Sequence, residues 1–450
     1  MNKLLLLLIT FFPVAAQGVK CPIPNCPKGQ LCFCPPPPPH YMVIKDKSTG
    51  SNSKAGKIFT DRLKSNFALT ASFSFKNKFS PKYQSSKTPL DQISKWHLIT
   101  LKLKQGNKTT GVEVKLFSRK TPRSSRKKEI WETSFNFNSS NLKKSTDLLG
   151  NQLMAKIIQR KFSAFGSKMA YVHNITRGKS YIRVAHFNGE EKDQSLSSHK
   201  LVSFKVSYNK EPFWGPRGEY LFFTSHARYN PDLYIVKPGN NPVKPLRISA
   251  RNGMNHAAVL SNKRKYLALT MDFRGNPDIY LLKPDFKTTK KWRIIKKLTT
   301  HHSIDTSPSF SPDGKRIVFV SNRRKRAQIF TKKIKGGKPR LLFSTGNRTY
   351  TPRWCSSGKR EYLAFTQLVG NKSVIYVYDL KTRGGWQATS SSAPNAENPA
   401  WSPHCNLISY ESSGSKTKKN GIWISPVRGG KSSVFLKGSL TMPAWDRGRK

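Results

Sequence analysis

Hydrophobic and polar positions in the second half of the chain follow a pattern that recurs about every 45 residues. Five stretches place an aromatic ring two residues after a proline, namely Trp214, Phe310, Trp354, Trp401 and Trp445. A degenerate copy puts Val259 in the remaining gap, so that successive ring positions lie 45, 51, 44, 47 and 44 residues apart. Short strands with such a period are typical of a β-propeller, in which each repeat forms one four-stranded blade.

Two apolar runs after each ring position predict further strands of the same blade. The first set covers residues 220–224, 266–270, 317–320, 362–366 and 407–410, and the second covers 232–236, 278–282, 328–331, 374–378 and 421–424. These runs are rich in β-branched and aromatic side chains, which indicates strands. An earlier pair, at 169–172 and 181–185, has no preceding ring position. We expect the final segment around Trp445 to complete that blade and to close a ring of six, which leaves no long unpaired edge.

Residues 41–160 lack the repeat and predict a small α/β domain. The expected elements are strands at 96–103, 112–117 and 130–137 and helices at 55–69 and 142–158. The last two strands are expected to be antiparallel, and Ser145 or Thr146 is expected to cap the second helix. The fold class is therefore mainly β: a six-bladed β-propeller over residues 161–450, preceded by this small α/β domain.

The first residues of the chain predict export. Residues 1–16 combine Lys3, an apolar core at 4–12 and small residues at Val14 and Ala16, which is the pattern of a cleavable signal peptide. The core is too short to span a bilayer, so we expect a soluble exported protein.

We interpret residues 17–40 as an extended tether. Four cysteines of this segment precede five consecutive prolines, namely Cys21, Cys26, Cys32 and Cys34. In an oxidising compartment such a cluster indicates disulfides, while zinc binding and cross-links to other envelope proteins stay open as alternatives. The other two cysteines, Cys355 and Cys405, fall on innermost strands of neighbouring blades, where we expect buried free thiols.

The chain is strongly basic, with 81 Lys and Arg against 23 Asp and Glu and a formal net charge of +58. One interpretation is attraction to a polyanion such as an anionic envelope surface, and the other is a solvated basic exterior. The densest run, residues 119–128, is expected at a hairpin tip. Because no zinc-finger spacing or aromatic RNA-binding motif accompanies the charges, and because export is expected, we do not expect a nucleic-acid partner.

Catalytic motifs do not accompany the repeat. A Gly-x-Ser-x-Gly nucleophile elbow is absent from the sequence, and the spacing from Ser311 to Gly314 does not fit a sialidase box. The adjacent pair His301-His302 has Asp305 as its nearest candidate partner in the same loop, which favours a solvated loop over a metal site. We therefore expect a binding protein rather than an enzyme, with no metal and no cofactor.

Partner binding is expected in the loops just before the innermost strands, because a rigid scaffold brings these loops together at one rim. The candidate residues are Lys210, Glu211, Asn255, His256, Asp305, Thr306, Tyr350, Thr351, Glu397, Asn398, Thr441 and Met442. Tyr350 is the expected anchor, since interfaces favour rigid amphipathic aromatic side chains.

One stretch carries a family resemblance. Residues 304–321 run Ile-Asp-Thr-Ser-Pro-Ser-Phe-Ser-Pro-Asp-Gly-Lys-Arg-Ile-Val-Phe-Val-Ser, and Gln-Ile-Phe at 328–330 and Gly-Gly at 336–337 follow. This resembles the blade pattern of the TolB family, the periplasmic component of the bacterial Tol–Pal envelope system. Residues 142–172 also resemble the junction between the two domains of that family.

The resemblance implies a propeller that holds the peptidoglycan-associated lipoprotein Pal on one face, with Thr306 and the Asn255-His256 loop at the contact. It also implies an N-terminus that reaches a TolA-like inner-membrane protein, although residues 21–39 depart from the family's sequence there. The expected role is a non-enzymatic periplasmic adaptor, a monomer peripheral to the outer membrane, that supports envelope integrity, protein import and constriction in cell division. A basic protein that binds an anionic surface polymer and a divergent propeller hydrolase are the alternative hypotheses.

Overall fold

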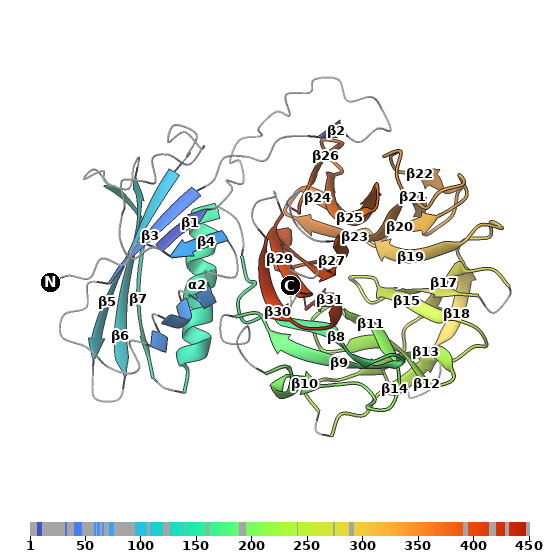
Figure 1. Cartoon of the computed structure of the whole chain (residues 1–450), viewed down its shortest axis with the longest axis horizontal. Helices are drawn as coiled ribbons and strands as arrows, with labels where there is room; N and C mark the ends of the chain where they lie inside the picture. Colours follow the sequence, from blue (N-terminus) through green and yellow to red (C-terminus); the bar gives the residue numbers. More distant parts are fainter. Residues whose placement is uncertain are drawn as a thin grey trace.

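The computed structural model describes most residues from 162 to 446 and separate segments before them (Figure 1). The gaps in the first range are residues 189–194, 241, 273–274, 288–291, 390–394, 414–419 and 428–431. The earlier described segments are residues 7–10, 32–33, 40–46, 58–59, 61–63, 65–66, 72–75, 95–105, 109–119, 127–138 and 140–158. Among these described residues, no helix combines the length and the apolar character that crossing a membrane requires.

A four-stranded sheet forms the N-terminal part of the structure. Its strands, in spatial order, are β3 (His40–Asp46), β5 (Lys95–Gln105), β6 (Thr110–Arg119) and β7 (Lys127–Phe137). Strand β3 runs parallel to β5, and the other pairs are antiparallel. The three predicted strands are confirmed, whereas β3 was not predicted because it lies at the boundary with the expected tether.

Two smaller features surround this sheet. Strand β1 (Leu7–Thr10), inside the expected signal peptide, pairs with β4 (Ser72–Phe75). Helical turns at residues 58–59, 61–63 and 65–66 lie within the helix predicted over 55–69.

Helix α2 (Leu142–Ile158) covers one face of the sheet, with the bounds that its apolar spacing predicts (Figure 1). The predicted cap at Ser145 or Thr146 is wrong, because both residues lie inside the helix. Ser145 N donates to the carbonyl oxygen of Asn141, and Thr146 Oγ1 donates to that of Leu142. The Asn141 side chain instead accepts from Asn138 N in the preceding turn.

Six sheets arranged in a ring form the rest of the described structure (Figure 1). Blade 1 contains β8 (Lys168–Thr176), β9 (Lys179–His186), β10 (Lys200–Leu201) and β31 (Leu440–Trp445). Blade 2 contains β11 (Asn209–Trp214), β12 (Leu221–Arg228), β13 (Asn230–Val236) and β14 (Leu246–Ser249). Blade 3 contains β15 (Asn255–Leu260), β16 (Leu267–Met271), β17 (Asp278–Lys283) and β18 (Arg293–Lys297).

The other three blades follow in chain order. Blade 4 contains β19 (Asp305–Phe310), β20 (Arg316–Ser321), β21 (Gln328–Lys333) and β22 (Arg340–Leu341). Blade 5 contains β23 (Thr349–Ser357), β24 (Arg360–Val369), β25 (Lys372–Asp379) and β26 (Gly384–Gln387), and β2 (Cys32–Phe33) pairs with β26 at its edge. Blade 6 contains β27 (Asn395–Trp401), β28 (Leu407–Ser413), β29 (Gly421–Pro426) and β30 (Ser433–Lys437).

The last strand closes the ring, as the sequence predicts. Strand β31 pairs antiparallel with β8, so that the C-terminal segment supplies the innermost strand of blade 1. One ring position is corrected by the strand register. Leu260 pairs with Leu267 as Trp214 pairs with Leu221, so Leu260 and not Val259 takes the ring position of blade 3. The degenerate copy lacks both the proline and the aromatic ring, which left its alignment ambiguous by one residue.

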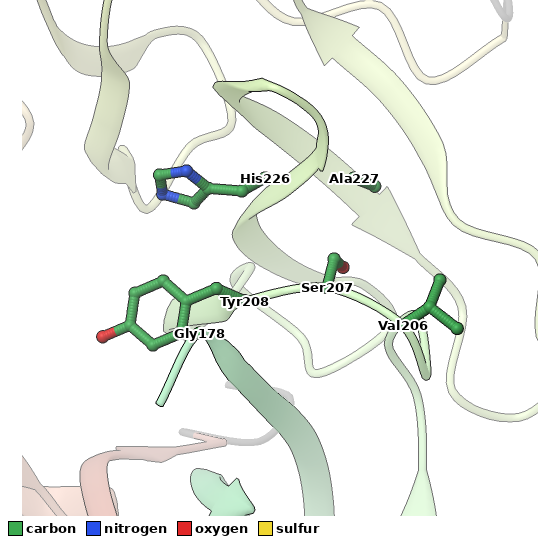
Figure 2. A pocket seen from close by; sticks show the side chains of 6 residues that line it. All are labelled: Gly178, Val206, Ser207, Tyr208, His226 and Ala227. Carbon is green, nitrogen blue, oxygen red and sulfur yellow. The ribbon is translucent and has the colours of Figure 1, made fainter. Parts of the chain in front are cut away.

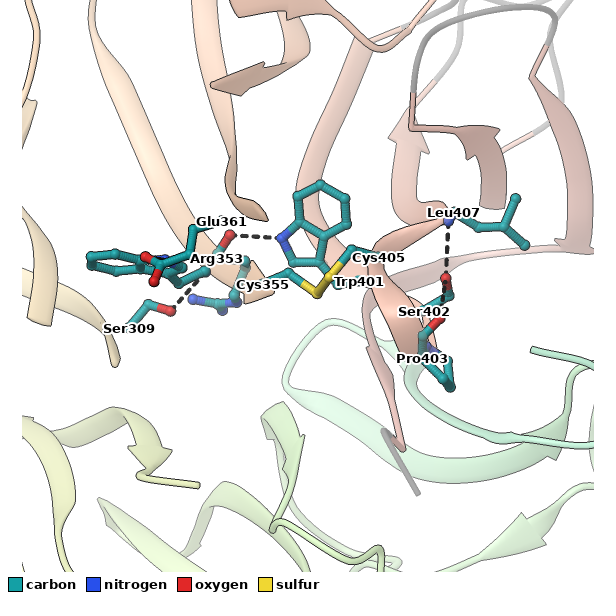
Figure 3. Close-up of a disulfide and its surroundings, with 10 residues drawn as sticks. Ser309, Arg353, Cys355, Glu361, Trp401, Ser402, Pro403, Cys405 and Leu407 are labelled. Atoms are coloured by element: carbon teal, nitrogen blue, oxygen red, sulfur yellow. Dashed lines mark hydrogen bonds between the residues drawn. A yellow bond between two sulfur atoms is a disulfide. The ribbon is translucent and has the colours of Figure 1, made fainter. Parts of the chain in front are cut away.

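The two cysteines predicted as free thiols form a disulfide between blades 5 and 6 (Figure 3). Cys355 lies on β23, and Cys405 lies in a short 3₁₀ turn, η4 (Pro403–Cys405), after β27. Sequence alone gives the blade of each cysteine but not the bend that turns Cys405 toward its neighbour. The prediction of free thiols is therefore wrong.

Phe165 connects the N-terminal part to the propeller. Its backbone N–H and carbonyl both bond to the side chain of Asn151 on α2, each over 3.0 Å. Its ring stacks on Phe187, which in turn contacts Trp445 of the closing strand with ring centroids 4.6 Å apart. One buried hydrophobic cluster therefore runs from α2 to β31.

Several predictions fall outside the described residues. These include the cleavage site after residue 16, the proline run at 35–39 and the side chains of Cys21, Cys26, Cys32 and Cys34. Their disulfide or zinc chemistry stays a prediction. The basic run at 119–128 connects the paired strands β6 and β7, and its residues 120–126 are likewise not described.

Candidate functional site

Every innermost strand of the propeller carries the same irregularity near its start. The pairing register shifts after Lys210, His256, Thr306, Tyr350, Glu397 and Thr441. The residue that follows each shift has a left-handed backbone, with φ of 54° at Glu211, 50° at Ala257, 54° at Ser307, 47° at Thr351, 51° at Asn398 and 49° at Met442. Positive φ is uncommon outside glycine, and bulges of this kind commonly re-aim side chains next to functional sites.

We call these six residue pairs the bulge ring. Its members are Lys210-Glu211, His256-Ala257, Thr306-Ser307, Tyr350-Thr351, Glu397-Asn398 and Thr441-Met442, all of them partly exposed. Ten of the twelve residues predicted as candidates for partner binding belong to it. The predicted setting was different, because these residues lie within the first part of each strand rather than in the loop before it.

Asn255 and Asp305 do not belong to the exposed ring. Both side chains are fully buried. Asn255 Oδ1 accepts from Ser249 Oγ over 2.8 Å, and both Asp305 oxygens accept from Arg323 within 2.9 Å. The hydrogen bonds of these two side chains hold the starts of their strands in place. Because both side chains are buried, they are not accessible to a partner. Proposing them as contact residues is thus corrected by the structure.

Glu211 joins two neighbouring bulges. Its Oε2 accepts from the backbone N–H of Ala257 over 2.7 Å, and its Oε1 lies 3.2 Å from His256 Nδ1. Burial alone would raise the pKa of Glu211, but the hydrogen bond and charge of His256, the charge of Lys210 and the Ala257 N–H outweigh burial and lower the pKa to about 2. The carboxylate is therefore ionised and fixed at neutral pH.

Glu411, which the sequence analysis did not identify, likewise joins two neighbouring bulges, those of blades 6 and 1. Its Oε2 accepts from the backbone N–H of Met442 over 2.6 Å. Burial raises the pKa of Glu411 against the lowering effect of that bond and of the Asn398 side chain, and the charge of Glu397 raises it further. Glu411 lies opposite Glu397 in the pairing of β27 with β28. The bond from Met442 N, on the closing strand of blade 1, shows that its carboxylate reaches the next blade.

Exposed apolar side chains gather at one end of the propeller. We call this end, where the innermost strands begin, the rim face. Six of the described large apolar residues with high exposure lie there: Ile175 (40%), Val206 (87%), Tyr229 (98%), Met254 (36%), Ile304 (47%) and Val369 (42%). They come from five blades, at strand starts or at hairpins of the same end. The other two described in the propeller, Leu246 and Ile295, lie on outermost strands.

A model of the TolB β-propeller domain family matches residues 155–448, well over half of the chain. The chain belongs to the TolB family. The crystal structure of TolB from Acinetobacter baumannii has a TM-score of 0.66 with this TolB-family chain and covers 93% of it and 99% of that protein, at 17% identity. At that identity the match shows a shared fold.

Curated relatives of this TolB-family chain include two proteins of moderate identity. "Protein TolB homolog" of Chlorobium luteolum is 28% identical over 194 residues, and "Tol-Pal system protein TolB" of Bordetella pertussis is 29% identical over 174 residues. The alignments cover 42% and 38% of this chain and 39% and 36% of those relatives, so the matched part spans less than half of their length.

The rim face of this TolB-family chain is basic as well as apolar. Exposed cations in its connections are Arg177, Lys205, Arg228, Arg324, Lys325, Arg326 and Arg348. The described acidic side chains at this end are engaged within the protein: Asp272 accepts from Met254 N, and Glu397 accepts from Ser373 Oγ. The positively charged side chains are therefore exposed to solvent, while these carboxylates form hydrogen bonds within the protein.

The described residues contain no cluster of three His, Cys, Asp or Glu side chains that could hold a metal ion. His301 and His302 lie in a loop before β19, with their rings 4.0 Å apart, and His301 Nδ1 accepts from Ser303 N.

Proposed function

We propose that this TolB-family protein is a non-enzymatic periplasmic adaptor of a Tol–Pal type system, which docks a Pal-type outer-membrane lipoprotein on its rim face. In this role it would support envelope integrity and constriction during cell division. The observation that carries the proposal is the set of exposed apolar residues from five blades that surrounds the bulge ring. The name of the Bordetella relative, which refers to the Tol–Pal system, supports the choice of partner.

The apolar residues indicate a surface that a protein covers. In a chain with 81 Lys and Arg, exposed apolar side chains from separate blades meet at one end. Burying such side chains contributes roughly 25 cal/mol per Å² of apolar area. Exposed apolar side chains that gather on one face beside charged residues mark surfaces that bind other proteins.

The bulge ring gives this surface a fixed shape. Carboxylates of Glu211 and Glu411 hold the backbone of the next blade at Ala257 and Met442. A surface that is ordered before binding loses little conformational entropy when its partner docks. Tyr350, partly exposed on the ring, remains the proposed aromatic anchor.

The test is calorimetric titration of the full chain with the purified soluble domain of the Pal-type lipoprotein from the same cell, at about 0.15 M salt. Binding at micromolar or lower concentration supports the proposal, and no binding at tens of micromolar would reject it. Ile304→Ser, on the rim face, should weaken binding about tenfold. Leu246→Ser serves as the matched control, because Leu246 is 44% exposed on an outermost strand and Ile304 is 47% exposed.

A second candidate function is capture of an anionic surface polymer, which the basic connections of the rim face favour. This function predicts affinity that falls steeply as salt rises, because each contact releases a counterion. Titration with a purified polyanion at several salt concentrations distinguishes the two. A salt response that stays flat argues against the polymer.

A further inference from the structure

An open groove lies on the rim face between blades 1 and 2. One part has a volume of about 420 Å³ and is lined by Gly178, Val206, Ser207, Tyr208, His226 and Ala227 (Figure 2). The adjoining part has a volume of about 550 Å³ and shares Gly178 and Tyr208 with the first. Its other lining residues are Asn174, Ile175, Thr176, Arg177 and Ser439. The groove starts beside the bulge ring, because Tyr208 and Ser439 precede strands β11 and β31.

The lining combines exposed apolar side chains with neutral polar ones and carries no negative charge. Val206 and Ile175 are 87% and 40% exposed, which makes them two of the apolar residues of the rim face. Arg177 is the one lining residue with a full formal charge, and Lys205 and Arg228 adjoin the lining residues in sequence and are exposed. The groove therefore offers apolar contact within a positive surround.

Two aromatic side chains line the groove. Figure 2 shows the rings of Tyr208 and His226 projecting to the same side, and their centroids are 5.6 Å apart. Burial lowers the pKa of His226, and the charge of Lys210 lowers it further, so the imidazole is neutral at pH 7. A neutral ring beside a tyrosine suits an aliphatic or aromatic side chain better than a carboxylate.

We infer that the groove between blades 1 and 2 binds an apolar side chain that a partner presents on an acidic segment. The exposed side chains of Val206 and Ile175 contact the apolar side chain. Arg177, Lys205 and Arg228 favour acidic residues around it. This inference deepens the proposed function and rests on it for the choice of the rim face. It adds the chemistry of the bound segment and a subsite outside the six-fold bulge ring.

The test uses two labelled nine-residue peptides and the full chain, with fluorescence anisotropy as the readout. Both peptides consist of alternating Asp and Glu around one central residue, which is leucine in the first and alanine in the second. Non-specific attraction to the basic surface affects both equally. We expect the leucine peptide to bind about tenfold more tightly than the alanine peptide at the same salt concentration, because its side chain is buried in the groove.

Variants assign that preference to the groove. Val206→Ser combined with Ile175→Ser should reduce the leucine-to-alanine ratio to about one. Ile295→Ser is the matched control, since Ile295 and Ile175 are both 40% exposed on strands, and it should leave the ratio unchanged. A ratio near one for the natural chain, absence of binding by both peptides, or a ratio that survives in the double variant would overturn the inference. The peptide assay contains no lipoprotein. A negative result in it therefore tests the groove alone and can be distinguished from a negative result in the titration with the lipoprotein.

Discussion

The indole N–H of Trp214 donates a hydrogen bond to the carbonyl oxygen of Ala444, which joins blade 2 to the closing strand over 3.1 Å. Trp401 makes the equivalent bond to the carbonyl oxygen of Arg353, over 2.7 Å, between blades 6 and 5 (Figure 3). In both cases the acceptor immediately precedes the ring position of the neighbouring blade. At these two interfaces the repeat therefore supplies both the ring that fills the interface and the carbonyl that orients it.

A chain that ends before Leu440 should lose cooperative folding. It would remove the strand that pairs with the inner edge of β8 and would remove Trp445 from the cluster that connects α2 to the propeller. The freed edge of β8 could pair with other chains. We expect aggregation in size-exclusion chromatography and a broad thermal transition. A chain that ends at Asp446 is the control, and equal behaviour of the two truncated chains would contradict closure by β31.

The sequence predicted the fold well because the fold is repetitive. Five proline-aromatic stretches gave ring positions, and the first four were each followed by apolar runs that became β-strands in the structure. Where the repeat was degenerate, at Val259 and Leu260, the alignment slipped by one residue. The periodicity of side chains thus predicts the strands and their order along the chain. The pairing register of a strand can be predicted only where the repeated motif is intact.

The candidate site was predicted less completely. The sequence located the strand starts, and so most of the bulge ring, but it could not show that Asn255 and Asp305 are consumed by internal bonds. Nor could it find Ile175 or Val369, which lie near the ends of the second strands of their blades, at the hairpins that reach the rim face. Such residues carry no local signal, because their exposure depends on how the blades are assembled.

The disulfide between Cys355 and Cys405 should contribute measurably to stability. It closes a segment with a sequence separation of 50 residues, and restricting the unfolded chain over that length is worth about 4 kcal/mol in the chain-entropy model. We expect Cys355→Ala with Cys405→Ala to lower the midpoint of guanidinium unfolding. The double substitution is preferable to a reductant, which would also act on the four N-terminal cysteines. An unchanged midpoint would contradict the prediction.

Glu211 should stabilise the protein in a pH-dependent way. Its folded pKa of about 2 lies below the ordinary value of 4.5, so its contribution is complete above about pH 4.5 and is lost as pH falls toward 2. We expect Glu211→Gln to cost on the order of 2 kcal/mol at pH 7 and less at pH 3. Chemical unfolding of both chains at the two pH values measures this. A difference that does not shrink at low pH would show that charge is not the cause.

Gly150 should be required where α2 meets the propeller. A Cβ at this position would lie 2.9 Å from Cδ2 of Phe165, whose ring is buried against Phe162 and Phe187. Alanine is favoured over glycine in a helix by about 1 kcal/mol, but overpacking a buried ring costs about 1–3 kcal/mol. We expect Gly150→Ala to destabilise the chain in thermal unfolding. Leu148→Ala, at a position 57% exposed on the same helix, should change stability little.

Docking on the rim face is tested most directly by hydrogen–deuterium exchange of the full chain, measured with and without the soluble domain of the Pal-type lipoprotein. The lipoprotein should slow exchange at the starts of the innermost strands and the nearby connections, around residues 174–178, 205–211, 254–257, 304–307 and 349–351. Exchange at the opposite turns, around 215–219, 261–265 and 311–315, should not change. Protection confined to those opposite turns, or no protection at a saturating concentration, would contradict the proposed docking surface.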